Sequence, residues 1–212
     1  MRSLHSITFD TSGLHFQGDR DGVRVWHTSD GDGIGLYYFP IPPDIEADLR
    51  SVDHVRAFYR AFIMQNNAAL IEVDILEVNG CRSVRQIIKV PQQPTGMTYL
   101  GSITLPFRDF SYVVKIQCME YGITGLRDSI VLSEKFNTGE VTIDEEDSTL
   151  RGWMQDPYDS SIHDVFSCNK SESEEYDERF PKHPLSRVRR LLRQVQETLQ
   201  LNEDVRNEPK FD

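Results

Sequence analysis

The sequence predicts an α+β protein, in which an antiparallel meander sheet carries packed helices and a C-terminal amphipathic helix. Asn79-Gly80 joins two runs of strand-forming residues, and this pair favours a two-residue hairpin turn because both of its positions need positive φ. Two further strand-like runs follow at 97–105 and 110–121, and such short links favour an antiparallel sheet. Leucine and valine recur at helical spacing over 184–201, which indicates the amphipathic helix.

Before the meander, the chain shows strand and helix signals in alternation. Residues 4–18 predict two short strands. Residues 22–28 alternate with period two, and a strand at 34–39 follows an Asp-Gly turn, so these two runs predict a hairpin. Residues 51–66 predict a helix, because Ser51 is a suitable N-cap and aromatic and aliphatic residues follow at spacings of three and four.

The strand predicted at 70–78 has two chemically different faces. The apolar side chains expected on one face are Ile71, Val73 and Ile75. With a period of two, Glu72 and Asp74 point to the other face. Together with Lys115 they could form a shallow site on the sheet, although solvated strand faces carry the same residue types.

A helix is predicted at 123–135, and the chain then changes character over 141–180. This segment has 12 Asp and Glu against 3 Lys and Arg, which indicates a long loop draped over the domain or partial disorder. The tail at 202–212 is expected to fray. The predicted divisions are a sheet domain at 1–140, an acidic loop-rich segment at 141–183, a helix of the same domain at 184–201, and the tail.

Composition restricts the function classes. The net charge of −11 argues against a nucleic-acid partner, because such binding neutralises phosphates with basic side chains. No run has the length and apolar character of a secretory signal or a membrane span. Cys81, Cys118 and Cys168 are odd in number and far apart, so a reducing compartment and a cytoplasmic location are expected.

The leading interpretation is a non-enzymatic protein-binding module, such as an adaptor, chaperone or toxin-neutralising protein. No Walker loop, GxSxG, HExxH or paired CxxC motif occurs, and no cofactor or metal site is predicted. The acidity favours a basic protein partner, with Trp153 and Tyr158 as candidate anchors. Arg187 and Arg190 share a helix face and are candidate binding residues, although pairing with the chain's own acidic segment and solvation are the favoured interpretation for the arginines of this helix.

An enzyme of unfamiliar type is the alternative. Its acid–base or metal residues would be Asp156, Asp159, His163 and His183. Asp156-Pro157-Tyr158-Asp159 also fits a turn in an acidic surface loop, and prolines beside His183 also fit a helix start. The enzyme hypothesis therefore requires these side chains to converge in one cleft.

The order of the predicted elements resembles the Mog1/PsbP-like fold, which includes the DcrB-related proteins. The elements in question are the hairpin at 23–39, the helix at 51–66, the meander at 70–121 and the later helices, and the resemblance covers about residues 20–135. It implies a mostly non-enzymatic role, since members bind GTPases, assist photosystem assembly or chaperone secreted effectors. It carries over no functional residue.

Overall fold

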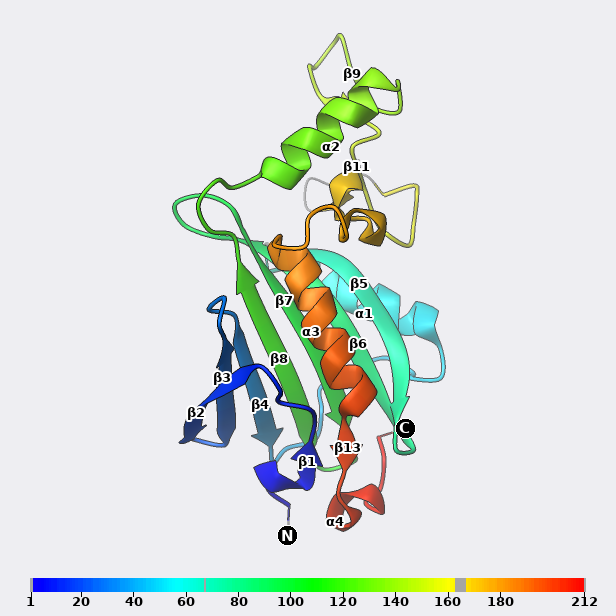
Figure 1. The fold of residues 1–212 in the computed structure, drawn as a ribbon. Coiled ribbons are helices and arrows are strands. Elements are labelled where there is room, and N and C mark those ends of the chain that lie inside the picture. Colours follow the sequence, from blue (N-terminus) through cyan, green and yellow to red (C-terminus); the bar gives the residue numbers. More distant parts are fainter. Residues whose placement is uncertain (1, 67, 163–166, 212) are drawn as a thin grey trace.

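A computed structural model describes residues 2–66, 68–162 and 167–211. The predicted α+β class is confirmed, because the chain forms a seven-stranded antiparallel sheet with helices packed on it (Figure 1). The strand order is β2-β3-β4-β8-β7-β6-β5. The strands are β2 (Leu14–Arg20), β3 (Val23–Thr28), β4 (Gly33–Phe39), β5 (Ala69–Val78), β6 (Cys81–Pro91), β7 (Met97–Pro106) and β8 (Ser111–Met119).

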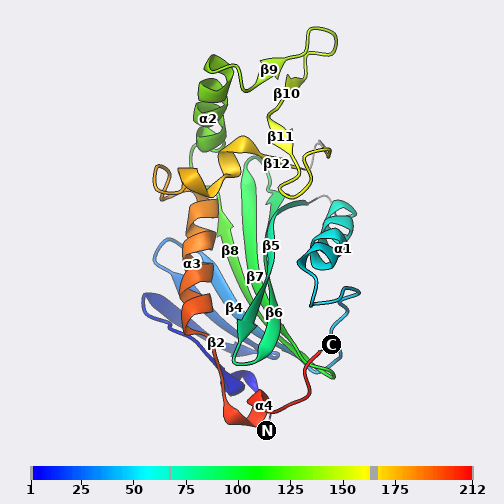
Figure 2. The ribbon, with the colours of Figure 1, turned by 90° about the vertical axis from the view of Figure 1, so that its right-hand side faces the viewer.

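The two longest helices lie on opposite faces of this sheet (Figure 2). Helix α3 (Pro184–Thr198) packs on β7 and β8, and α1 (Val52–Met64) packs on β5. The side chain of Ser51 accepts a hydrogen bond from the backbone of His54, as its predicted N-cap role requires. In the described part of the chain, no helix combines the length and hydropathy needed to cross a bilayer. The cytoplasmic location stays a prediction.

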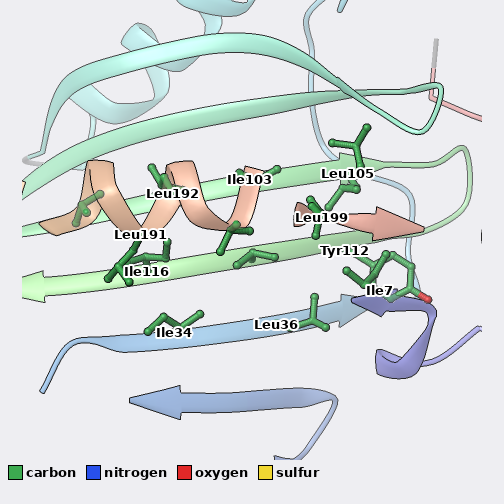
Figure 3. Close-up of a cluster of buried hydrophobic side chains, with 14 of the residues drawn as sticks. Ile7, Ile34, Leu36, Ile103, Leu105, Tyr112, Ile116, Leu191, Leu192 and Leu199 are labelled. Carbon is green, nitrogen blue, oxygen red and sulfur yellow. The ribbon is translucent and has the colours of Figure 1, made fainter. Parts of the chain in front are cut away.

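The main hydrophobic core fills the space between α3 and the sheet. Figure 3 shows Leu191 and Leu192 of α3 close to Ile103 and Ile116 of the central strands. The close approach depends on Gly101 in β7, where an added Cβ would lie 2.7 Å from side-chain carbons of α3. A side chain at this position would therefore push the helix away from the sheet.

A second core lies under α1, and it corrects one prediction about β5. Ile71 does not share a face with Val73, because it packs in the α3-side core whereas Val73 packs under α1. The pairing of β5 with β6 shifts register between Leu70 and Glu72. A β-bulge of this kind places one extra residue in a strand and so breaks the period-two alternation.

The two ends of the chain are held together. Strand β1 (Ile7–Thr8) pairs with β13 (Gln200–Leu201) rather than with β2, so the C-terminal helix ends at Thr198, three residues before the predicted end. The expectation that the tail frays is wrong. Helix α4 (Glu203–Arg206) contains the fully buried Val205, and Phe211 packs against the α1-side core.

The described residues between the sheet and α3 form a lobe beyond the end of the sheet (Figures 1 and 2). Helix α2 (Leu126–Asn137) occupies the predicted helical region and begins after Gly125, which has a φ of 70°. Four two-residue strands follow: β9 (Thr142–Ile143), β10 (Leu150–Arg151), β11 (Met154–Gln155) and β12 (Cys168–Asn169). Residues 170–172 and 174–176 form 3₁₀ turns. Val131, Val141 and Trp153 form a small third core in this lobe.

Candidate protein-binding groove

A groove of about 930 Å³ lies between β5, α3 and the acidic segment, the name used below for residues 141–180. Eight carboxylates and five cations line it. The carboxylates are Glu72, Asp74, Glu140, Asp156, Glu172, Glu174, Glu175 and Glu197, and the cations are Arg85, Lys135, Lys170, Arg189 and Arg193. Within the described chain, no hydrogen bond or ion pair engages the carboxylates of Glu175 and Glu197, so the surplus negative charge faces solvent.

Buried Glu172 attaches the acidic segment to the sheet. Its carboxylate accepts hydrogen bonds from Lys89 Nζ at 2.7 Å and from Tyr99 Oη at 2.8 Å. It also accepts the backbone N–H of Asn169 at 2.8 Å. Burial and the nearby charge of Glu172 raise the pKa of Tyr99 well above its ordinary value, so the phenol keeps its proton and acts as a donor.

A second buried network links the lobe to α3. The carboxylate of Asp177 accepts hydrogen bonds from both Arg127 and Arg189 at 2.9 Å. Arg189 also binds Glu72 of β5, and Glu72 accepts a further bond from Arg85 at 2.7 Å. Burial acts to raise the pKa of Glu72, but the charges of Arg189 and Arg85 outweigh burial, and the pKa lies below its ordinary value. In this part of the groove wall, Glu72 is therefore ionised and hydrogen-bonded to two arginines.

The two candidate anchors are engaged within the chain. Trp153 is 7% exposed and packs in the third core, with part of its surface on the groove. Tyr158 is half-buried, and the guanidinium of Arg56 lies 4.0 Å from the centre of its ring. Their roles as anchors for a partner stay predictions.

Arg187 and Arg190 lie on a second groove, which has a volume of about 820 Å³ and carries the exposed side chains of Tyr121 and Ile123. Arg187 is buried and binds both oxygens of Asp32, with its Nη2 2.9 Å from Oδ1. Arg190 is exposed and donates to the carbonyl of Pro181 at 3.3 Å. Arg190 is thus more accessible to a partner than Arg187. Binding of a partner by either residue stays a prediction.

The residues of the enzyme hypothesis are placed in two different surroundings. Asp156 accepts two hydrogen bonds of 2.7 Å from Arg60, and its Oδ1 accepts the backbone N–H of Asp159 at 2.9 Å. Asp156 and Asp159 therefore belong to one turn. His183 lies on the second groove instead, where its Nδ1 accepts the N–H of Leu185 and so caps α3.

His163 lies outside the described residues. For the other three candidates, no contact joins His183 to either aspartate within the described chain. In that same part of the molecule, no group of three or more His, Cys, Asp or Glu side chains could hold a metal ion. Asp156, Asp159 and His183 therefore do not share one cleft. Their role as acid–base or metal residues stays a prediction.

No protein-family model matches the chain, and no curated protein matches it. Among solved structures, it is similar to the solution structure of cyanobacterial PsbP (CyanoP) from Synechocystis sp. PCC 6803. The TM-score is 0.36 and the sequence identity 15%, and the match covers 63% of this chain and 82% of that chain. The resemblance to the Mog1/PsbP-like fold is confirmed to this extent, and a similarity this distant carries no argument about function.

Proposed function

We propose that this chain is a non-enzymatic protein-binding module that binds a basic partner in the groove between β5, α3 and the acidic segment. The surplus of carboxylates in the groove is the observation that supports the proposal. A basic partner would relieve the repulsion among these carboxylates, and the overall charge of −11 would steer it toward the chain. An adaptor, a chaperone or a toxin-neutralising protein would each use such a surface.

The groove has a wall of buried hydrogen-bond networks and a rim of exposed ion pairs. Glu172 and Asp177 are held in buried networks, so the wall needs little reorganisation on binding. On the rim, Glu174 pairs with Arg193, and their side chains are 63% and 59% exposed. An exposed pair of this kind contributes about 0–1 kcal/mol, so a cation of the partner can replace Arg193 at small cost.

The proposal is tested by recovering the partner from the source cells at low and high salt, and then measuring its affinity for matched variants. We expect the double variant Glu175→Gln, Glu197→Gln to weaken the complex about tenfold, or about 1.4 kcal/mol. The control, Glu145→Gln with Glu146→Gln, changes the net charge equally at exposed positions that do not line the groove. An affinity that is the same at low and high salt, or that falls equally in both double variants, would overturn the proposal.

A further inference from the structure

Strand β5 is the last strand of the sheet, and no other strand among residues 2–66, 68–162 and 167–211 pairs with its outer side. The two-residue turn at Asn79-Gly80 makes Val78 and Cys81 a hydrogen-bonded pair. Because hydrogen-bonded and non-hydrogen-bonded pairs alternate along an antiparallel ladder, the N–H and C=O groups of Val73, Ile75 and Glu77 point away from β6.

The outward groups of Val73 are already occupied. The Tyr158 hydroxyl lies 2.6 Å from the Val73 nitrogen and 3.2 Å from its carbonyl oxygen, and Arg56 Nε lies 3.4 Å from the same oxygen. No backbone hydrogen bond from the described chain engages the outward groups of Ile75 and Glu77. Ile75 lines the groove, so this free edge opens onto the acidic surface.

We propose that the basic partner binds by strand addition, with an extended segment pairing with the backbone of β5 at Ile75 and Glu77. This inference rests on the proposed function of the groove. Tyr158 limits the added strand at one end, and the Asn79-Gly80 turn limits it at the other. Backbone pairing supplies affinity in this binding mode, and alternate side chains supply specificity. Lysine or arginine at every second position would face the carboxylates beside the edge.

Charge argues against a second copy of this chain as the occupant. Pairing of two β5 edges would bring two copies of the acidic groove together, and an antiparallel pair centred on Glu77 would set this residue opposite the same residue of another molecule. Like charges directly opposite one another in a sheet are destabilising. A basic segment reverses the sign of that interaction, and Glu77, which is exposed on the edge, would then attract it.

The test uses the full chain and a fluorescent eight-residue peptide in which lysine and valine alternate. Glu77→Pro removes the outward N–H without removing a bond of the native ladder, since proline is tolerated where an edge N–H faces solvent. Its matched control is Glu77→Ala, which removes the same charge and keeps the N–H. We expect Glu77→Pro to bind the peptide about tenfold more weakly than Glu77→Ala does. Methylating alternate peptide nitrogens should weaken binding to the native chain to a similar extent.

Failure of the strand-addition inference differs from failure of the proposed function. Salt-sensitive binding that is lost in the Glu175→Gln, Glu197→Gln variant, but equal in Glu77→Pro and Glu77→Ala, would overturn strand addition and leave the acidic groove as the site. Absence of salt-sensitive peptide binding would overturn both. Slowed hydrogen exchange at the amides of Ile75 and Glu77 on peptide addition is the expected direct signature. If the chain instead forms a dimer without peptide, and Glu77→Pro dissociates this dimer, then a second copy of the chain occupies the edge and the proposal is wrong.

Discussion

The backbone N–H of Val73 in β5 donates a hydrogen bond to the hydroxyl of Tyr158, whose oxygen lies 2.6 Å from the Val73 nitrogen. A side chain from the acidic segment thus takes the place of a neighbouring strand at one point of the β5 edge. Exposed edges of sheets invite pairing with other chains, and side chains that cover them limit this pairing. Tyr158 therefore has two effects, because it anchors the acidic segment and also shortens the open edge.

Replacing Tyr158 with Phe should separate these effects from the packing of the ring. The variant keeps the aromatic contact with Arg56 and loses the hydrogen bonds to Val73, so we expect the free energy of unfolding to fall by about 1 kcal/mol. The Val73 amide should exchange faster. Denaturant titration and hydrogen exchange measure the two results. Tyr121→Phe, at a side chain that is 61% exposed, is the control and should change neither. An unchanged Val73 amide would show that the hydroxyl does not protect the edge.

Replacing Arg127 should lower the free energy of unfolding more than replacing an exposed cation of the lobe. Its fully buried guanidinium donates to Asp177, to Ser186 and to the backbone carbonyls of Ser171 and Ser173. Arg127→Met would leave the buried partners without their donor, and we expect a loss of about 3–5 kcal/mol in the free energy of unfolding.

The matched control for Arg127 is Arg179→Met. Arg179 pairs with Glu134, and both side chains are nearly half exposed, at 47% and 46%. A surface pair of this kind contributes about 0–1 kcal/mol. Chemical denaturation of both variants provides the comparison. Similar losses in the two would mean that the buried network does not hold the lobe on the sheet.

Local chemistry was enough to predict most of the sheet and its helices. Asn79-Gly80, the Ser51 cap and the proline at the start of α3 each act within a few residues, and each has the predicted role. The errors arose where distant segments meet. The bulge at Ile71 lets β5 contribute side chains to the cores on both faces of the sheet, and β13 pairs with β1 from the other end of the chain.

The site was harder to predict than the fold for the same reason. Arg127 and Asp177 lie 50 positions apart, and no local pattern marks them as partners. The open edge of β5 exists because β8 pairs with β4, which leaves the other end of the meander free. The excess of acidic residues in 141–180 was visible in the sequence, but a count of charges does not show which carboxylates are paired.

His183 makes stability depend on pH. Burial and then the charges of Arg127, Arg187 and Arg189 lower its pKa to about 3, although a Glu120 oxygen lies 3.7 Å from its Nε2. The folded chain therefore keeps the ring neutral down to about pH 3, whereas the unfolded chain protonates it below about pH 6.5. This contribution to stability is complete above about pH 6.5 and is lost as the pH falls toward 3, because the unfolded state then binds one more proton.

His183→Asn tests this dependence, since asparagine is a good N-cap and can still accept the N–H of Leu185. Between about pH 4.5 and 6.5, the free energy of unfolding of the native chain should fall by about 1.4 kcal/mol per pH unit more than that of the variant. Urea titrations at four pH values measure the two slopes. Parallel slopes would mean that the histidine titrates alike in the folded and unfolded states.

Gly101 and Gly33 offer a test of the packing between α3 and the sheet. An added Cβ at Gly101 would lie 2.7 Å from carbons of Val188 and Leu192, whereas at Gly33 its nearest neighbour would be His27 Cδ2 at 3.9 Å. Gly101→Ala should therefore lower the free energy of unfolding by about 1–3 kcal/mol, because α3 must shift outward. Gly33→Ala should have little effect or be slightly stabilising, because alanine restricts the unfolded chain. Thermal and denaturant unfolding measure both variants. Equal stability of Gly101→Ala and Gly33→Ala would mean that α3 does not pack closely on β7 as Figure 3 shows. The positions of Arg189 and Arg193, which α3 contributes to the groove, would then also be in question.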